Sequence, residues 1–356
     1  MVNKLHSIRL EVIVLSAAVL LPSAALAGNE VRYAQILETN ESVTGVRGDG
    51  GAGVVLTGSY QNSGETQGLL YRGPLYPTKM GTIYTPVPTF SGQTVTSSLF
   101  YGPNTFVFDR SLGAGNVRVV GSYQQESTGS DNYGFIYKGP LYSGTTVPDG
   151  ATWTEINVPS DLAGGPVQDT IPHSTMGDLV VGNYDLVSAP LSTGNAFIYN
   201  IRSGSWKLFD FGGSMTNETT AYGIWHNGGN SYTIVGGTDY HGIQEGFLVD
   251  YDSVSERFSH LTLYKHHLVT HFEGITGTGR GFNLIATTAT GAAFASVTVK
   301  PDGSFSDAIW TPISYPGGKL STGNSVYKNV AMGIYTVQGS ESFRSYIAAV
   351  TAPEPR

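Results

Sequence analysis

Histidines are the side chains of this sequence best suited to chemistry, because they are few and unevenly placed. Four of the 8 histidines fall between positions 260 and 271. A neutral imidazole can bind a divalent metal or act as a general base near neutral pH. The sequence therefore predicts a possible divalent-metal site on two neighbouring loops, built from His266, His267, His271, His241 and Asp239, with Glu273 as an alternative carboxylate. Surface histidines without a ligand are the other interpretation of these loops.

A second set of candidate residues recurs about once in every 50 residues, in strands that precede an aliphatic run. Its members are Tyr101, His173, Tyr222, Glu273 and Tyr327. Aromatic faces stack on sugar rings, and polar tips hydrogen-bond to hydroxyls. If these strands line one channel, we expect Tyr101, Tyr222 and Tyr327 to bind a ligand at its mouth, with His241 in a nearby loop. Ordinary packing of channel side chains is the alternative.

Three of these residues have the chemistry that catalysis would need: His173, Tyr222 and Glu273. Histidine and tyrosine can serve as base and acid when a uronic-acid polysaccharide is cleaved by elimination. The sequence contains no G-x-S-x-G, H-E-x-x-H or G-x-x-x-x-G-K motif and no cysteine. The glycine-rich residues 48–53 are typical of a hairpin loop. Asp250 and Asp252 are typical of a turn, since the Gly and Glu of a calcium loop do not follow.

Internal repeats show which elements must position these side chains. An aliphatic run that ends in a small residue recurs at residues 54–60, 119–123, 179–184 and 232–236, and more weakly at 284–286 and 330–335. A second strand follows each copy, at residues 68–71, 134–137, 196–199, 246–248, 293–294 and 345–347. A third carries one large aromatic, at Tyr84, Trp153, Trp206, Phe258 and Trp310. A further strand precedes each aliphatic run. Each repeat therefore contains four strands in about 50 residues, which is the period of propeller blades.

The last repeat lacks its outermost strand, and the start of the chain supplies a candidate. Residues 31–37 form an unassigned strand, and Tyr33 lies 51 positions before Tyr84, in the aromatic register. Pairing these two ends would cover two sheet edges that would otherwise be exposed. We therefore predict an all-β fold: a single β-propeller of six four-stranded blades, whose last blade is closed by the N-terminal strand.

Composition agrees with this fold and excludes several others. The 356 residues include 47 glycines and 21 tyrosines, but no cysteine and only 13% charged residues. Hairpins use glycine, and strands use aromatic residues. Coiled coils and disordered chains need more charge, and disulfide scaffolds and zinc ribbons need cysteine. The net charge is −8, and no basic run is present, which argues against a nucleic-acid partner.

The first 27 residues are typical of a secretory signal peptide. Lys4 and Arg9 precede an apolar run at residues 12–21, and an A-x-A cleavage pattern follows at residues 25–27. The run is shorter than the ~20 residues that span a bilayer, and no later stretch is long enough. We expect a secreted protein, periplasmic or extracellular, with the propeller at residues 28–350 and a tail at 351–356.

The strand motifs resemble the HAF-type repeats of secreted bacterial proteins. Residues 221–224, 234–236 and 246–248 are similar to the Ala-x-Gly-Ile-Asn, Val-Gly and His-Ala-Phe elements of that repeat. The phenylalanine recurs at Phe135, Phe197, Phe247 and Phe294, but the preceding histidine does not occur. The resemblance implies secretion and a propeller-like fold, without a defined activity. Residues 353–355, Pro-Glu-Pro, resemble the start of a C-terminal sorting signal or are a chance tripeptide.

Two functions are consistent with these observations. The first is non-catalytic binding of carbohydrate, or of an envelope or extracellular protein, through the rim or the channel. The second is an extracellular polysaccharide lyase or glycoside hydrolase that works at the channel mouth. The missing acid–base and metal motifs favour the first, although the fold itself supports neither.

Overall fold

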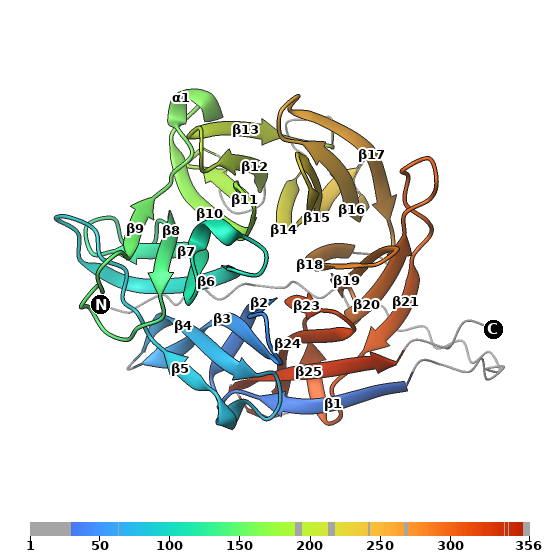
Figure 1. Cartoon of the computed structure of the whole chain (residues 1–356), viewed down its shortest axis with the longest axis horizontal. Helices are drawn as coiled ribbons and strands as arrows, with labels where there is room; N and C mark the ends of the chain where they lie inside the picture. Colours follow the sequence, from blue (N-terminus) through green and yellow to red (C-terminus); the bar gives the residue numbers. More distant parts are fainter. Residues whose placement is uncertain are drawn as a thin grey trace.

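The computed structural model describes residues 30–351, apart from residues 63, 189–193, 213–217, 241–242, 267–269, 338 and 341. Its strands form six antiparallel sheets arranged in a ring (Figure 1), and we call the region along the central axis of this ring the channel. The fold is therefore a six-bladed β-propeller, as the repeats predicted. The predicted signal peptide, residues 1–27, and residues 352–356 of the predicted tail lie outside the described residues.

Each blade runs outward from the channel, and we call its strands A to D in that order. Blade 1 contains β2 (Glu41–Gly48), β3 (Gly53–Asn62), β4 (Glu65–Pro74) and β5 (Thr82–Tyr84). Blade 2 contains β6 (Val95–Thr105), β7 (Asn116–Gln125), β8 (Tyr133–Pro140) and β9 (Thr152–Glu155). Blade 3 contains β10 (Val167–Met176), β11 (Leu179–Leu186), β12 (Asn195–Asn200) and β13 (Ser205–Phe209).

The second half of the ring repeats this order. Blade 4 contains β14 (Thr219–Gly228), β15 (Ser231–Tyr240), β16 (Ile243–Asp252) and β17 (Arg257–Tyr264). Blade 5 contains β18 (Thr270–Thr278), β19 (Gly281–Thr288), β20 (Gly291–Thr298) and β21 (Ile309–Ile313).

The described helices are one turn long: η1 (Thr78–Met80), η2 (Arg110–Leu112) and α1 (Ser160–Ala163). Within the part of the chain that the structure describes, no helix is long and apolar enough to cross a membrane.

Blade 6 joins the two ends of the chain. Its strand A is divided into β22 (Gly318–Ser321) and β23 (Ser325–Tyr327), followed by β24 (Val330–Val337) and β25 (Phe343–Thr351). Strand D is β1 (Glu30–Ile36), which pairs antiparallel with β25 from Glu30↔Thr351 to Ile36↔Ser345. The predicted closure by the N-terminal strand is confirmed. This pairing covers the edge of β25, which would otherwise expose backbone donors and acceptors.

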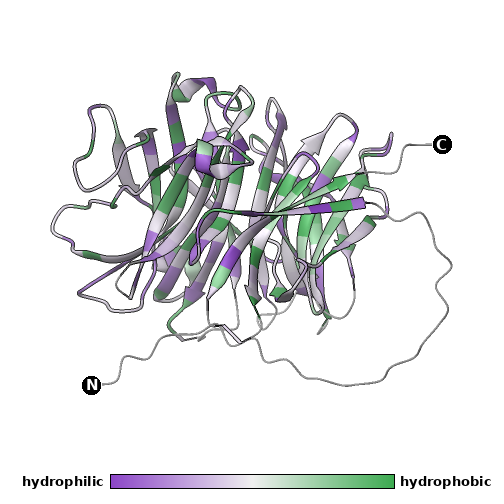
Figure 2. Ribbon diagram, turned by 90° about the horizontal axis from the view of Figure 1, so that it is seen from below, coloured by the Kyte–Doolittle hydropathy of each residue, from purple (hydrophilic) through white to green (hydrophobic). Residues whose placement is uncertain are grey.

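The hydrophobic core lies between neighbouring blades. Figure 2 shows apolar residues along the strands and hydrophilic residues toward their ends. Between blades 1 and 2, for example, Val55 and Leu70 of blade 1 pack with Phe100 and Val119 of blade 2, and all four are buried. The strand-D aromatic Trp153 joins this cluster, with its ring centroid 5.2 Å from that of Phe135. Such strand-D aromatics therefore have a structural role, which explains much of the aromatic content.

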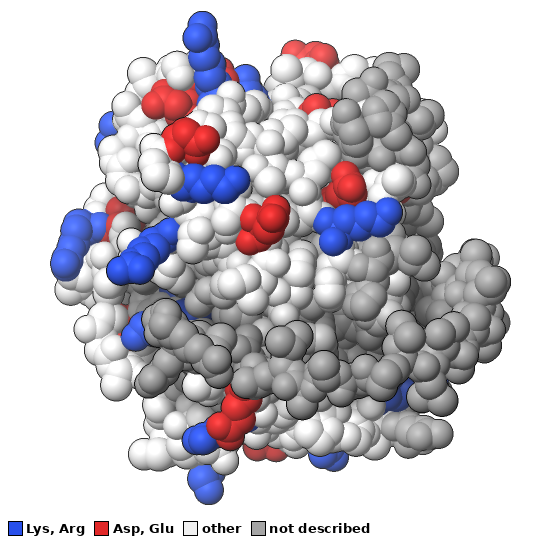
Figure 3. Space-filling view, turned by 90° about the vertical axis from the view of Figure 1, so that its right-hand side faces the viewer, with Lys and Arg blue, Asp and Glu red and all other residues white. Residues whose placement is uncertain are grey.

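Charged residues are sparse on the outer surface. On the side of the molecule seen in Figure 3, basic and acidic side chains are interspersed over uncharged surface. One exposed ion pair joins Arg32 to Glu30, at 3.0 Å on strand β1. Both side chains are well exposed, so the pair contributes little to stability.

Candidate functional site

One residue bulges from strand A at the same height in each of five blades. The pairing of strand A with strand B skips Thr44, Tyr101, His173, Tyr222 and Glu273, and in blade 2 also Gly102. In blade 6, Asn324 takes the sixth position, directly before the first paired residue of β23. A bulge leaves one residue unpaired and turns its side chain away from the ladder. We call Thr44, Tyr101, His173, Tyr222, Glu273 and Asn324 the bulge ring.

In blades 1 and 4, a glycine of the repeated aliphatic run lies beside the bulge, whereas Ala286 holds this position in blade 5. Gly58 and Gly236 lie opposite the residue before the bulge in blades 1 and 4. A Cβ on either glycine would be 1.8 Å from a strand-A carbonyl oxygen, that of Ser42 or Thr220. Glycine is therefore the residue that allows the two strands to approach this closely.

Ring residues are reachable by solvent, although they sit in the middle of the molecule. Each of the six is partly exposed, while both of its neighbours in the sequence are buried. Tyr222, for example, lies between the buried Ala221 and Gly223. The bulges thus present one polar side chain per blade to the channel.

Aromatic contacts connect the ring across blades 2, 3 and 4. The imidazole of His173 lies edge-to-face between Tyr101 and Tyr222, with centroid distances of 4.6 Å to each. Burial raises the pKa of both tyrosine hydroxyls, and the nearby Glu273 carboxylate adds to the effect. Both phenols therefore stay protonated at neutral pH and can donate hydrogen bonds.

His173 is neutral at physiological pH. Burial lowers its pKa to about 4, although the negative charge of Glu273 and a hydrogen bond with Asn183 partly oppose this shift. Its Nε2 lies 2.7 Å from Oδ1 of Asn183, so this nitrogen carries the proton. The other nitrogen, Nδ1, is then the unprotonated one and has the electronic character of a base.

His271, in contrast to His173, favours the protonated, positively charged form. Its Nε2 lies 2.7 Å from Oε1 of Glu273, and the two side chains are 27% and 23% exposed. Burial would lower the pKa of His271, but the Glu273 charge and hydrogen bond together outweigh it and raise the pKa. Tyr222 links the two histidines, since its ring centroid is 5.4 Å from that of His271. The bulge ring thus contains one neutral imidazole, that of His173, and contacts a second one, that of His271, which favours the cation.

Arg47 forms the floor of the ring. Its side chain crosses the channel from blade 1 to blade 4, where Nη2 donates to the backbone oxygen of Ile224 at 3.1 Å. The guanidinium also lies 5.8 Å from the ring centroid of Trp225. Phe108 packs edge-to-face on Trp225 at 5.6 Å and supports it from below. Arg47, Trp225 and Phe108 therefore fill the lower part of the channel.

The space between ring and floor is small. A cavity of about 20 Å³ is lined by Thr44, Arg47, His173, Tyr222, Glu273 and Ser325, among others. This volume holds about one water molecule. Arg47 Nε is buried and has no hydrogen-bond partner among the described residues, so it is available to such a water. A sugar ring does not fit at this depth and would have to contact the ring residues from the mouth.

Carboxylates surround the mouth on blades 3 and 4. We call Asp169, Asp185, Glu218 and Asp239 the acidic collar. Burial raises the pKa of Asp185 to about 6, with further contributions from Asp169 and Glu218. Burial likewise raises the pKa of Glu218, and the charge of Asp239 adds to it. Because like charges gather here, the collar disfavours an anionic ligand.

The described members of the predicted metal site are separated. His271 points to Glu273 in the channel, whereas His266 stacks on Trp310, with ring centroids 4.4 Å apart. Asp239 belongs to the acidic collar. Among the described residues no group of three His, Cys, Asp or Glu side chains could hold a metal ion. His241 and His267 lie outside the described residues, so their part of the prediction stays untested.

The other sequence candidates are placed as follows. His173, Tyr222 and Glu273 come together in one cavity wall, and Tyr101 contacts His173. Tyr327 is not in the bulge ring, because blade 6 places Asn324 there. The hydroxyl of Tyr327 lies instead beside Gly48, at the far end of strand β2.

Sequence reasoning missed Thr44, Asn324 and Arg47. The signal for Thr44 was present, since Thr44-Gly45-Val46 matches Tyr222-Gly223-Ile224 in the repeat. Asn324-Ser325-Val326 matches it more weakly. No repeat pattern indicates Arg47, whose role depends on the opposite blade.

No protein-family model and no curated protein sequence matches this chain. The HAF-type and sorting-signal resemblances therefore stay predictions.

Several solved structures are similar to this chain at low identity. A GH43_1 enzyme from Xanthomonas citri is 9% identical, with a TM-score of 0.39 over 77% of this chain and 93% of that one. The catalytic domain of a GH62 α-L-arabinofuranosidase from Coprinopsis cinerea is 9% identical, with a TM-score of 0.37 over 93% and 94%. The β-propeller domain of the Trilobed protease from Pyrococcus furiosus is 7% identical, with a TM-score of 0.38 over 86% and 93%. Similarity this low carries no inference about activity.

Proposed function

We propose that this protein is a secreted, non-catalytic β-propeller that binds carbohydrate at the mouth of its channel. The observation that carries the proposal is the bulge ring: six polar side chains, one from each blade, partly exposed between buried neighbours. Tyrosine and histidine rings offer apolar faces together with hydrogen-bonding tips, which suits sugars. Secretion rests on the signal-peptide pattern of residues 1–27.

The acidic collar favours neutral or basic sugars over uronic acids. Burial raises the pKa of Asp185 to about 6, and the nearby charges of Asp169 and Glu218 add to this shift. A polyanion would bring further negative charge to this mouth, at an electrostatic cost. An envelope or extracellular protein with a neutral glycan is an equally suitable ligand.

Two features support binding rather than turnover. The cavity beside His173, Tyr222 and Glu273 has a volume of about 20 Å³, which is too small for a sugar ring. The ring also contains a single carboxylate, Glu273, and glycoside hydrolysis generally uses two. Glu273 is in addition engaged by His271 at 2.7 Å.

One observation favours a polysaccharide lyase as the second candidate. His173 is neutral, since burial lowers its pKa to about 4, and its ring centroid is 4.6 Å from that of Tyr222. A neutral imidazole beside a protonated phenol is a plausible base and acid for elimination.

A polysaccharide screen separates the two candidates. Purified protein is incubated with neutral and anionic polysaccharides, and binding, new unsaturated ends and new reducing ends are measured together. Our proposal predicts binding to neutral polysaccharides without new ends. Turnover that disappears in His173→Gln or Glu273→Gln would overturn the proposal of non-catalytic binding and support the polysaccharide lyase.

A further inference from the structure

Blade 2 departs from the repeat at the end of the channel opposite the bulge ring. Strands A and B are joined by two residues in blades 3, 4, 5 and 6, and by four in blade 1. In blade 2 the same connection has ten residues, 106–115, and includes η2. Long ordered loops on a repeated scaffold are common places for binding sites.

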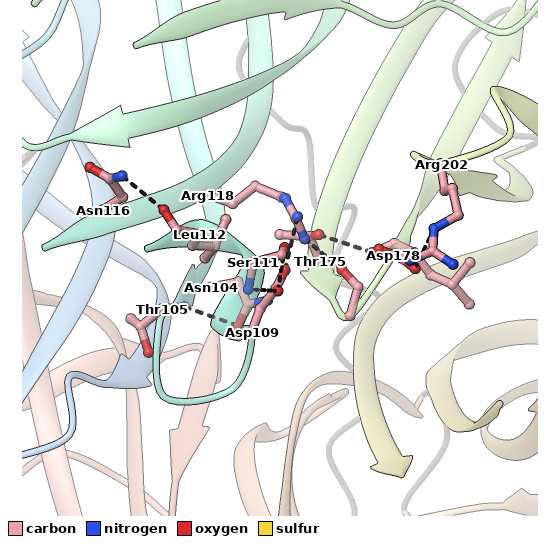
Figure 4. A network of polar contacts seen from close by, with 12 residues as sticks. Asn104, Thr105, Asp109, Ser111, Leu112, Asn116, Arg118, Thr175, Asp178 and Arg202 are labelled. Carbon is pink, nitrogen blue, oxygen red and sulfur yellow. Dashed lines mark hydrogen bonds and ion pairs between the residues drawn. The ribbon is translucent and has the colours of Figure 1, made fainter. Parts of the chain in front are cut away.

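Buried contacts hold this loop in one position (Figure 4). Arg118 Nη2 lies 2.9 Å from Oδ2 of Asp109, and the two side chains are 5% and 9% exposed. Arg118 Nη1 also donates to the backbone oxygen of Gly177 in blade 3 at 2.5 Å. Leu112 is buried, and Phe108 packs on Trp225. The loop is therefore anchored to blades 2, 3 and 4 and can form a pre-organised wall.

A groove lies between this loop and blade 1. Its cavity has a volume of about 200 Å³, ten times that of the channel cavity. Cavities of ~150 Å³ already hold a benzene ring. The groove therefore has room for one substituted six-membered ring.

Polar groups of both signs line the groove. Asp49 and Arg72 of blade 1 form a loose ion pair, with 3.5 Å between Oδ2 and Nε, and their side chains are 18% and 38% exposed. Oδ1 of Asp49 accepts a hydrogen bond from the backbone of Gly51 at 3.1 Å, which fixes the carboxylate. At the start of β7, Asn116 donates from its Nδ2 to the backbone oxygen of Leu112 at 2.8 Å, which leaves its amide oxygen to accept from a ligand.

Apolar groups complete the groove. Val55 and Val117 are buried and form its floor. Phe106 forms part of the loop wall, and the guanidinium of Arg110 lies 4.5 Å from its ring centroid and fixes its orientation. A carboxylate beside a guanidinium supplies an acceptor and a donor to adjacent hydroxyls, while the aromatic and aliphatic groups contact the C–H face of a sugar.

We propose that the groove formed by Asp49, Arg72, Phe106 and Asn116 is a second ligand site, which binds one neutral hexose unit. The charges of Asp49 and Arg72 balance, so the groove favours an uncharged polyhydroxyl ring over an anion or a cation. The site lies at the opposite end of the channel from the bulge ring and shares no residue with it.

Titration calorimetry and saturation-transfer NMR with methyl hexosides test this proposal. The methyl glycosides of glucose, galactose and mannose are compared with glucuronate, glucosamine and a neutral tetrasaccharide. We expect at least one neutral hexoside to bind, and Asp49→Asn and Arg72→Gln each to weaken it by roughly tenfold or more, since each removes a hydrogen bond to a charged group. If the tetrasaccharide binds no more tightly than the best methyl hexoside, the site takes a single sugar unit. If it binds more tightly, the natural source of the sugar is a polysaccharide chain.

A matched control is available in blade 3. Asp178 and Arg202 form a similar exposed pair, with 3.6 Å between Oδ2 and Nε, outside the groove. Asp178→Asn should leave hexoside binding unchanged. The groove proposal is overturned if no neutral hexoside binds, if glucuronate or glucosamine binds more tightly, or if Asp49→Asn has no more effect than Asp178→Asn. Loss of binding in Tyr222→Phe alone would assign the sugar to the bulge ring instead.

Discussion

The two ends of the channel are built by different means. At the upper end, a bulge repeated from blade to blade presents one polar side chain per blade. At the lower end, Arg47, Trp225 and Phe108 fill the channel, and the groove lies beside the ten-residue loop of blade 2. The upper site thus comes from the repeat with varied side chains, and the lower site comes from a break in the repeat.

In the upper site, the backbone geometry is repeated while the chemistry of the side chains varies. Opposite the residue before the bulge, blades 1 and 4 have a glycine, Gly58 or Gly236, and blade 5 has Ala286, so the bulge is a property of the strand pair. The bulged side chain is then free to differ, from Thr44 to His173 to Glu273. In the lower site a single buried ion pair, Arg118 with Asp109, stabilises a loop that no other blade has.

The largest effect is expected at the lower end. Arg118→Met leaves Asp109 as an uncompensated buried charge, because both side chains are less than 10% exposed. We expect the free energy of unfolding to fall by about 3–5 kcal/mol, measured by urea denaturation. The matched variant Arg202→Met breaks a well-exposed pair and should cost about 0–1 kcal/mol. Equal effects of the two changes would show that the loop is not anchored by this pair.

The fold was predictable from the sequence because each blade must repeat the same hairpins. The aliphatic runs gave the strand B positions, and the orphan strand at residues 31–37 gave the closure with β25. The candidate site was predictable in part: His173, Tyr222 and Glu273 recur at the repeat period and meet in one cavity wall.

The rest depended on contacts that a single sequence does not encode locally. Tyr327 appeared equivalent to Tyr222, but it pairs with Val330 as Trp225 pairs with Thr233, so it is the counterpart of Trp225 and Asn324 takes the ring position. His271 was expected with His266 on the rim, yet alternation along β18 turns it toward the channel and Glu273. Arg47 reaches Ile224, 177 residues away.

A moderate effect is expected from filling the space opposite a bulge. Gly236→Ala would bring a Cβ to within 1.8 Å of the Thr220 backbone oxygen, so the strand pair must shift. We expect a loss of about 1–3 kcal/mol in the free energy of unfolding, typical of overpacking. Gly165→Ala is the control, because a Cβ there has no neighbour within 4 Å. A Gly236→Ala protein as stable as this control would contradict the role given to the repeat glycine.

A smaller and pH-dependent effect distinguishes the two channel histidines. Burial lowers the pKa of His173 to about 4, so the unfolded chain binds its proton more readily than the folded one between about pH 6.5 and 4. Stability from His173 is therefore complete above its ordinary pKa and is lost as pH falls through this window.

For His271 the sign is reversed. Its raised pKa, due to Glu273 against the effect of burial, means that its contribution is present below the ordinary pKa and is lost as pH rises through the raised value. Imidazole NMR shifts recorded against pH should show His271 protonating first. Glu273→Gln should remove that order by lowering the pKa of His271, and an unchanged titration of His271 in this variant would refute the pairing.

Binding of a neutral oligosaccharide to two tyrosine variants tests the central claim most directly. Tyr222 belongs to the bulge ring, whereas Tyr327 lies outside it beside Gly48, and the Phe substitution removes only a hydroxyl from each. With the groove disabled by Asp49→Asn, we predict that Tyr222→Phe lowers the remaining affinity severalfold and that Tyr327→Phe leaves it unchanged. Equal affinities for the two variants, or no binding to the Asp49→Asn protein before either change, would contradict a carbohydrate site at the bulge ring.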